Sequence, residues 1–246
     1  MGTVRSIIFH GAWALWTALF GLAIPVLWLS GSPPKVVRMF TRVWARGILI
    51  MLSSIVGLRY EIWHAGYAPA TPSLIISNHQ STWETLAALV LFPDVAIVAK
   101  RELLRIPVMG WYLRRSPMIL IDRDAAADAL RQMVVQSRTA LAAGRSVLIF
   151  PEGTRKRVDT PIEFQRGVEL LYRMLGVPSV PMVVNSGRFW GIGGGALRPG
   201  VITVAYSAPV DPKLGSGDFI RTTTAVMESE KATIEDHFAI NSGSRQ

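Results

Sequence analysis

The sequence predicts an α/β protein with a mixed central sheet flanked by helices, preceded by an N-terminal membrane-associated helical segment. A long apolar stretch without charge opens the chain, and short apolar runs then alternate with helical patterns. Hydrophobic residues make up 50% of the chain and charged residues only 17%, against about a quarter in soluble domains. We therefore expect membrane-anchoring helices over residues 1–57, an α/β domain over 58–240 and a tail over 241–246.

The apolar stretch Ile7–Leu29 carries no formal charge at neutral pH. As a helix it would be roughly 34 Å long, against a hydrocarbon core of about 30 Å. Trp13, Trp16 and Trp28 suit the membrane interface, while Pro25 is expected to kink or end the helix. A full crossing and a shallow re-entrant insertion are both open. A cleaved signal peptide is disfavoured, because the stretch is long and no A-x-A site follows it.

A basic helix is expected next, from Lys35 to Leu58. Its apolar part, Gly47–Gly57, is too short to span a bilayer. This pattern predicts a helix at the bilayer surface with its cations near lipid phosphates, the alternative being a solvated helix face. The basic stripe consists of four residues at helical spacing: Lys35, Arg38, Arg42 and Arg46.

The net charge of +9 favours anionic partners, which include nucleic acid, an anionic bilayer surface and a phosphorylated substrate. The absence of cysteine excludes disulfides, thiolate zinc sites and a cysteine nucleophile. If the first segment spans a membrane, the basic residues after it outnumber the lone Arg5 before it. We therefore expect the protein in the cell inner membrane, with its α/β domain on the cytoplasmic side.

The α/β domain is expected to contain seven strands and four helices. The predicted strands are Arg59–His64, Ser73–Ser77, Val95–Ala99, Met118–Ile121, Ser146–Phe150, Ser179–Val184 and Val201–Tyr206. The predicted helices are Thr82–Leu91, Ala125–Ala143, Glu163–Leu175 and Phe219–Phe238. Asp124 suits the N-cap of the second helix, while Gly144 and Gly176 follow the ends of the second and third.

A histidine follows directly on one of these strands. The strand 73–77 runs into the string NHQSTWE, residues 78–84, in which Ser81 or Thr82 suits the start of the next helix. His79 thus lies at the carboxyl end of a strand, where α/β sheets commonly place their ligands. The other three histidines of the chain have no such setting.

Glu84 is the candidate partner of His79. Residues five apart on a helix point about 140° away from each other, so the two meet only if His79 lies in the preceding turn and bends back. A carboxylate there would select the tautomer of the imidazole and stabilise its protonated form. No G-x-S-x-G elbow is present, which favours activation of a substrate hydroxyl. A helix-capping histidine is the alternative. We expect no metal site, because neither H-E-x-x-H nor another nearby ligand is present.

A second string, FPEGTR at residues 150–155, follows another buried strand. Proline and glycine enforce a tight turn, and Gly153 lets backbone N–H groups approach an anion. Arg155 supplies a planar fork suited to phosphate, although a surface turn with solvated charges is the alternative. A third string, residues 118–123, brings Arg123 to the same edge of the sheet, and a fourth, VPSVPMVVN at 177–185, forms a proline-flanked strand that could shape a wall.

Together these four strings closely resemble the PlsC family of glycerolipid acyltransferases, also called 1-acyl-glycerol-3-phosphate (lysophosphatidate) acyltransferases. The resemblance spans roughly residues 73 to 187 in the expected order. The family's first block, N-H-x4-D, matches Asn78, His79 and Glu84, so that glutamate replaces the usual aspartate. The second block ends in an arginine that contacts acceptor phosphate in the family, which maps to Arg123.

The third block is present without a change, and the resemblance implies that its residues bind the acceptor. The substrate-binding residues implied in this way are Asn78, Arg123, Glu152, Gly153, Thr154 and Arg155. The fourth block carries over loosely to Pro181 and Asn185, with a part in binding the acyl donor.

The resemblance also implies an activity. His79 would act as general base while a fatty acyl group moves from acyl-CoA or acyl-carrier protein to the sn-2 hydroxyl of 1-acyl-glycerol 3-phosphate, forming phosphatidate. The expected partners are the lipid bilayer, the lysophospholipid acceptor and the acyl donor, with no cofactor and no nucleic acid. The alternatives are another acceptor, such as a lyso-ornithine lipid or glycerol 3-phosphate, and a non-catalytic basic membrane-bound binding protein.

Overall fold

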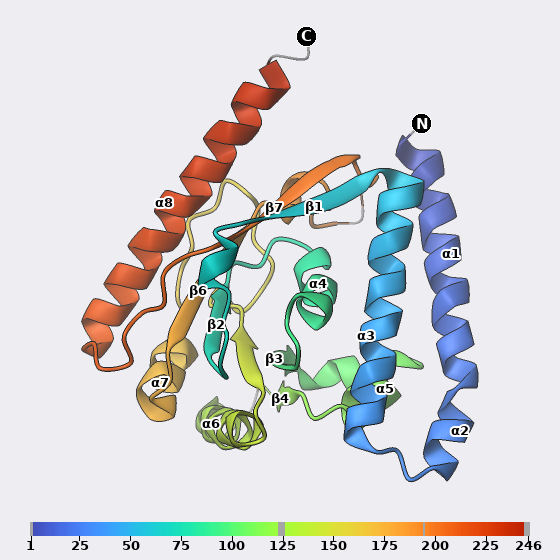
Figure 1. Cartoon of the computed structure of the whole chain (residues 1–246), viewed down its shortest axis with the longest axis horizontal. Helices are drawn as coiled ribbons and strands as arrows, with labels where there is room; N and C mark the ends of the chain where they lie inside the picture. Colours follow the sequence, from blue (N-terminus) through green and yellow to red (C-terminus); the bar gives the residue numbers. More distant parts are fainter. Residues whose placement is uncertain (1, 123–125, 194, 244–246) are drawn as a thin grey trace.

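The structure is a computed structural model that describes residues 2–122, 126–193 and 195–243 (Figure 1). Over these residues, seven strands form one sheet in the order β1-β7-β6-β2-β5-β3-β4. The strands are β1 (Leu58–Trp63), β2 (Leu74–Ser77), β3 (Val95–Lys100), β4 (Ile119–Ile121), β5 (Ser146–Ile149), β6 (Ser179–Val184) and β7 (Gly200–Tyr206). Each predicted strand is therefore present, with ends that differ by one residue at most.

The sheet is mixed, as predicted. The strands β6, β2, β5, β3 and β4 run parallel to one another. At the other side, β7 is antiparallel to β6 and parallel to β1. All residues of β2, β5 and β6 are buried, which explains why these strands read as continuous apolar runs. Their carboxyl ends meet at a single edge of the sheet.

Helices cover both faces of the sheet (Figure 1). The described α-helices are α1 (Gly2–Leu22), α2 (Ile24–Leu29), α3 (Pro34–Met51), α4 (Trp83–Leu91), α5 (Met109–Arg115), α6 (Ala126–Ala142), α7 (Arg166–Leu175) and α8 (Ser216–Gly243). Side chains alternate between the faces, so that Ile75 of β2 packs beneath α1, α3 and α4, whereas Leu74 and Ile76 pack beneath α6, α7 and α8.

The glycine signals at helix ends are confirmed. Gly144, two residues after the end of α6, and Gly176, directly after α7, adopt positive φ angles of 77° and 60°. Asp124, the predicted cap of α6, lies outside the described residues. The sequence did not indicate α5, and it placed the end of the last helix too early. That helix continues to Gly243 and so takes in residues 241–243 of the predicted tail, because no residue before Gly243 interrupts it.

The N-terminal segment folds into a helical hairpin, in which α1 and α2 form one arm and α3 the other (Figure 1). The first helix breaks at Ala23, two residues before Pro25, as the proline predicted. Two helical stretches, Gly2–Leu29 and Pro34–Val56, are long and apolar enough to cross a membrane, with mean hydropathies of 1.8 and 1.4. Length and composition alone place them in this class.

The hairpin packs along the α/β domain. The Ser6 hydroxyl accepts a hydrogen bond from the backbone N–H of Leu197 at 2.8 Å, near the start of α1. Near the end of α1, the Tyr112 hydroxyl donates to the carbonyl of Phe20 at 2.9 Å. Exposed apolar side chains cover the opposite side: Val4, Ile7, Ile8, Leu15, Leu19, Leu22, Val26, Trp28, Leu29, Val36, Met39, Val43 and Ile50.

Two of the three tryptophans predicted at an interface are instead used in packing. Trp16 donates its indole N–H to the carbonyl of Trp44 at 3.0 Å, and Trp13 packs edge-on against Trp190. Only Trp28 of the three remains largely exposed, at 61%. Helix periodicity turns the ring of Trp13 toward the α/β domain and that of Trp16 toward α3.

The basic stripe of α3 also differs from its prediction. Arg38 pairs with Asp94 at 3.0 Å, and Arg42 donates to backbone carbonyls at the end of α4, including Leu89 at 3.2 Å. Asp94 also binds the buried Arg145 at 2.9 Å. Half of the stripe therefore fastens the hairpin to the domain, because carbonyls left free at the end of α4 attract cations. Lys35 and Arg46 remain exposed.

Candidate active site

The site forms where three parallel strands end. His79 follows β2, Glu152 follows β5 and Ser186 follows β6. Asn78 connects two of these strand ends, since its amide donates to the carbonyl of Val184 and accepts from the same residue's N–H, both at 2.8 Å. Asn78 is only 1% exposed, so its side chain holds the turn, whereas the resemblance implied contact with substrate.

His79 and Glu84 meet as predicted. His79 lies in the turn before α4 and bends back, so that its Nδ1 is 2.8 Å from Oε1 of Glu84 in the first turn of that helix. The imidazole stacks on the ring of Phe150, with centroids 4.1 Å apart and planes 17° from parallel. Its side chain is 18% exposed, whereas that of Glu84 is fully buried. Glu84 thus fixes one edge of the ring and Phe150 covers one of its faces, while part of the ring remains exposed.

Hydrogen-bond donors surround the carboxylate of Glu84. Oε1 accepts from the backbone N–H groups of Gln80 and Ser81 at 2.6 and 2.7 Å, in addition to His79. Oε2 accepts from the hydroxyls of Ser81 and Ser186, both at 2.7 Å. Burial alone would raise the pKa of Glu84, but His79 and these donors outweigh it and leave the pKa below the ordinary value. Glu84 is therefore held as an anion, and the donors around it are placed for the length of a glutamate side chain.

Glu152 is directed inward. It is 4% exposed, and its Oε2 accepts the backbone N–H of His79 at 2.6 Å. Burial raises the pKa of Glu152 to about 8, against the lowering effect of that hydrogen bond. The next residue, Gly153, has a φ of 68°, and the N–H of Lys156 then donates to the carbonyl of His79 at 2.7 Å. The turn after β5 therefore clamps the backbone of His79 from both sides.

The remaining predicted residues lie at the surface of this turn. Thr154 and Arg155 are exposed, and Nη1 of Arg155 lies 3.3 Å from the hydroxyl of Thr82. Arg123 lies outside the described residues. The strand before it, β4, runs parallel to β3 and β5 and ends toward the same edge.

Sequence reasoning missed Ser186 and the packing role of Phe150. Ser186 follows β6 just as His79 follows β2, so the strand-end rule could have identified it. Asn185 and Pro181, which carried over loosely, are both buried in the described structure, and the Asn185 side chain accepts from the backbone N–H of Thr203 at 2.9 Å. Neither faces a free surface.

The region that contains these strand ends is similar to known acyltransferases. A family model described as Acyltransferase matches residues 61–185, which include the three strand ends. A Pseudomonas aeruginosa protein named 1-acyl-sn-glycerol-3-phosphate acyltransferase is 35% identical over 205 residues, covering 82% of this chain and 78% of that protein. The chain belongs to the acyltransferase family. His79 and Glu84 thus lie within the matched acyltransferase region.

Other acyltransferases extend the comparison. The human 1-acyl-sn-glycerol-3-phosphate acyltransferase alpha is 32% identical over 72% of this chain, which spans 61% of the human protein. The crystal structure of the 1-acyl-sn-glycerophosphate acyltransferase PlsC from Thermotoga maritima matches with a TM-score of 0.70 and 20% identity, covering 96% of this chain and 98% of that one. The latter likeness shows a shared acyltransferase fold.

Glu84→Gln should lower turnover by about 10²-fold while leaving the fold intact. Glutamine keeps the length and an oxygen for Nδ1 of His79, and the hydroxyls around Oε2 can reorient, so mainly the charge is lost. Glu84→Asp should fall about tenfold, because a shorter side chain withdraws from donors placed for glutamate. Turnover at saturating substrate across a pH series measures both. Wild-type turnover in the glutamine variant would exclude Glu84 as the orienting group.

Glu152→Gln should remove part of the loss of stability at alkaline pH. A folded-state pKa of about 8, above the ordinary 4.5, means that folding favours protonated Glu152. This contribution is complete below about pH 4.5 and is lost as pH rises through about 8. The wild type should therefore lose more apparent Tm between pH 6 and 9 than the variant, by a few degrees. Glu163→Gln, an exposed change, should behave as wild type, and equal slopes in all three proteins would contradict the assignment.

Proposed function

We propose that the protein transfers a fatty acyl group from acyl-CoA or acyl-carrier protein to the sn-2 hydroxyl of 1-acyl-glycerol 3-phosphate, forming phosphatidate, with His79 as general base. The observation that carries the proposal is the buried, anionic Glu84 bound to Nδ1 of an accessible imidazole. Its occurrence in an acyltransferase with relatives named for this acceptor supports the choice of substrate.

The reaction follows from this geometry. In the neutral tautomer whose Nδ1–H donates to Glu84, the lone pair of Nε2 accepts the proton of the acceptor hydroxyl as its oxygen attacks the thioester carbonyl. The negative Glu84 stabilises the imidazolium. When the tetrahedral intermediate collapses, the C–S bond breaks and the imidazolium returns its proton to the thiolate. The products are the ester and the free thiol carrier, and no acyl-enzyme forms.

Arg155 is proposed to bind the phosphate of the acceptor, together with Arg123. Arg155 is exposed, and its Nη1 lies 3.3 Å from the Thr82 hydroxyl. Thr82 directly precedes the helix that carries Glu84, so a phosphate on Arg155 would lie next to the reacting groups. Glu152 and Asn78 contribute differently, by holding the turn of His79.

We propose that the hairpin attaches the protein to the inner membrane on its cytoplasmic side by lying in one leaflet. The hydrogen bonds of Leu197 and Tyr112 hold both ends of α1 against the α/β domain, so neither end is free to cross. The exposed apolar side of the hairpin would enter the hydrocarbon. A one-chain lipid could then reach the site from the bilayer.

His79→Ala should remove nearly all transferase activity, by about 10²–10⁴-fold, without changing the fold. The assay uses purified protein, labelled acyl donor and a panel of lyso-lipids that includes 1-acyl-glycerol 3-phosphate and a phosphate-free acceptor. His10→Ala, an exposed change on α1, is the control. More than about a tenth of wild-type turnover in His79→Ala would rule out this base. Preference for the phosphate-free acceptor would rule out the proposed substrate.

Arg155→Lys should raise the acceptor KM about tenfold with little change in kcat, because lysine keeps the charge but loses the two-pronged fork. Arg173→Lys on the exposed side of α7 serves as the matched control. Steady-state kinetics with each substrate varied in turn give the answer. An effect confined to the acyl donor would overturn the assignment of Arg155 to the acceptor.

A further inference from the structure

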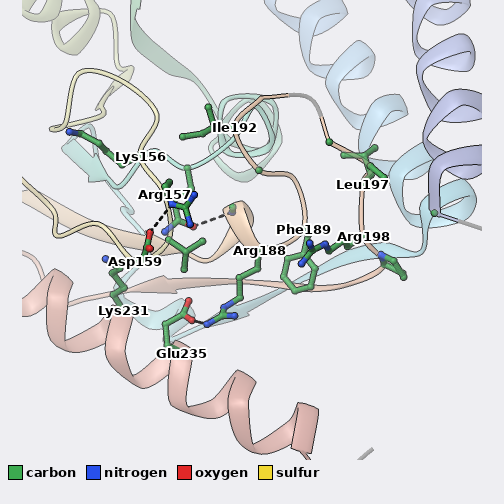
Figure 2. Close-up of a pocket in the computed structure, with 18 of the residues that line it drawn as sticks. Lys156, Arg157, Asp159, Arg188, Phe189, Ile192, Leu197, Arg198, Lys231 and Glu235 are labelled. Carbon is green, nitrogen blue, oxygen red and sulfur yellow. Dashed lines mark hydrogen bonds and ion pairs between the residues drawn. The ribbon is translucent and has the colours of Figure 1, made fainter. Parts of the chain in front are cut away.

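A cavity of about 940 Å³ opens beside the turn that carries His79 (Figure 2). Its walls come from the turns after β2 and β5, the segment between β6 and β7, and α8. Gln80, the neighbour of His79, lines it, and so does Lys156, whose N–H donates to the carbonyl of His79. We call this cavity the basic pocket. It adjoins the proposed reaction centre without including it.

The basic pocket has an excess of positive charge. Five basic and three acidic side chains line it, a difference of two positive charges. Each of the three acids forms an ion pair with a basic residue of the pocket: Asp159 with Arg157 at 3.2 Å, Glu228 with Lys231 at 3.8 Å, and Glu235 with Arg188. In the described part of the chain, the other two cations have no carboxylate within ion-pair distance; these are Lys156 and Arg198.

The three matched pairs hold the walls in place. Lys231 of α8 also donates to the carbonyl of Thr160 at 2.6 Å, which joins α8 to the loop after β5. Arg188 lies over the ring of Phe238 at 4.5 Å in addition to its acidic partner. The pocket also has an apolar wall, in which Ile192 is 48% exposed. A ligand with anionic groups and an apolar or aromatic part would fit such a lining.

The basic pocket extends from the turn after β5, where Lys156 follows Arg155 of the proposed acceptor site, past the end of β2 to the segment between β6 and β7. In the sheet order, β5, β3 and β4 lie on one side of β2, and Arg155 of the proposed acceptor site follows β5. On the other side of β2 lies β6, followed by β7, and the pocket takes Arg188 and Arg198 from the segment between them. The acceptor and the acyl donor must meet at His79, so the side of β2 toward β6 is available to the acyl donor.

We propose that the basic pocket binds the phosphorylated nucleotide of acyl-CoA, with Lys156 and Arg198 as ligands of its phosphates. The inference rests on the proposed function and selects one of its two donors. Small-molecule sites have volumes of about 300–1,000 Å³, which suits a nucleotide carrier, whereas a carrier protein would need a broad docking face. With the nucleotide in this pocket, the arm of acyl-CoA that carries the thioester runs past Gln80 to reach His79.

Direct binding of CoA tests this without catalysis. Calorimetric titration of the full chain in detergent should show CoA binding, which Lys156→Ala and Arg198→Ala each weaken by about tenfold. Arg221→Ala is the matched control, since Arg221 lies on α8, 79% exposed and paired with Asp218. The two pocket variants should also raise the KM for acyl-CoA and leave the acceptor KM unchanged.

The outcomes separate this inference from the proposed function. CoA binding that depends on Lys156 and Arg198, in a protein that does not acylate lysophosphatidate, would support the pocket and refute the proposed reaction. Acylation from acyl-carrier protein without CoA binding would keep the reaction and overturn the pocket. Wild-type CoA affinity in both variants, or an increase confined to the acceptor KM, would equally overturn the pocket.

Discussion

The buried carboxylate of Glu84 is the interaction on which the site depends. Five donors surround it; four come from residues 79–81 in the turn after β2, and the fifth is the hydroxyl of Ser186, which follows β6. An anion taken out of water is tolerated only when it is hydrogen-bonded on all sides. The parallel strands supply this because they end at one edge. The same contacts therefore stabilise the charge and fix one face of the imidazole of His79.

A second carboxylate supports the same histidine through its backbone. Glu152 accepts the N–H of His79, and the next turn of chain returns a donor to the His79 carbonyl. The two glutamates thus differ in state: donors keep the pKa of Glu84 low, whereas burial keeps that of Glu152 high. Their environments thus favour a charged Glu84 and a protonated Glu152, which avoids repulsion between two buried carboxylates. One orients the ring and the other holds the main chain.

Much of this was predictable from the sequence. Short apolar runs predicted the strands, and the runs of β2, β5 and β6 are continuous because these strands are buried on both faces. Strand-end placement predicted the pairing of His79 with Glu84. Local patterns could not predict contacts distant in the chain. Ser186 reaches Glu84 only because β6 lies beside β2, and Arg38 turns to Asp94 only because α3 packs on α4. Composition cannot distinguish a cation that faces lipid from one that joins two parts of the fold.

The bridge through Asp94 has a mechanical consequence. Arg38 of α3 and the buried Arg145 of the α/β domain share this one carboxylate, so the N-terminal helices and the sheet are joined through charges as well as apolar packing. If the helices enter a lipid layer as proposed, the depth of α1 and α3 would set the height and tilt of His79 above it. A lipid hydroxyl would meet the histidine at a constant level, and differences in chain length would be accommodated within the bilayer. The N-terminal helices would then fix the position of the site relative to the bilayer as well as attach the protein to it.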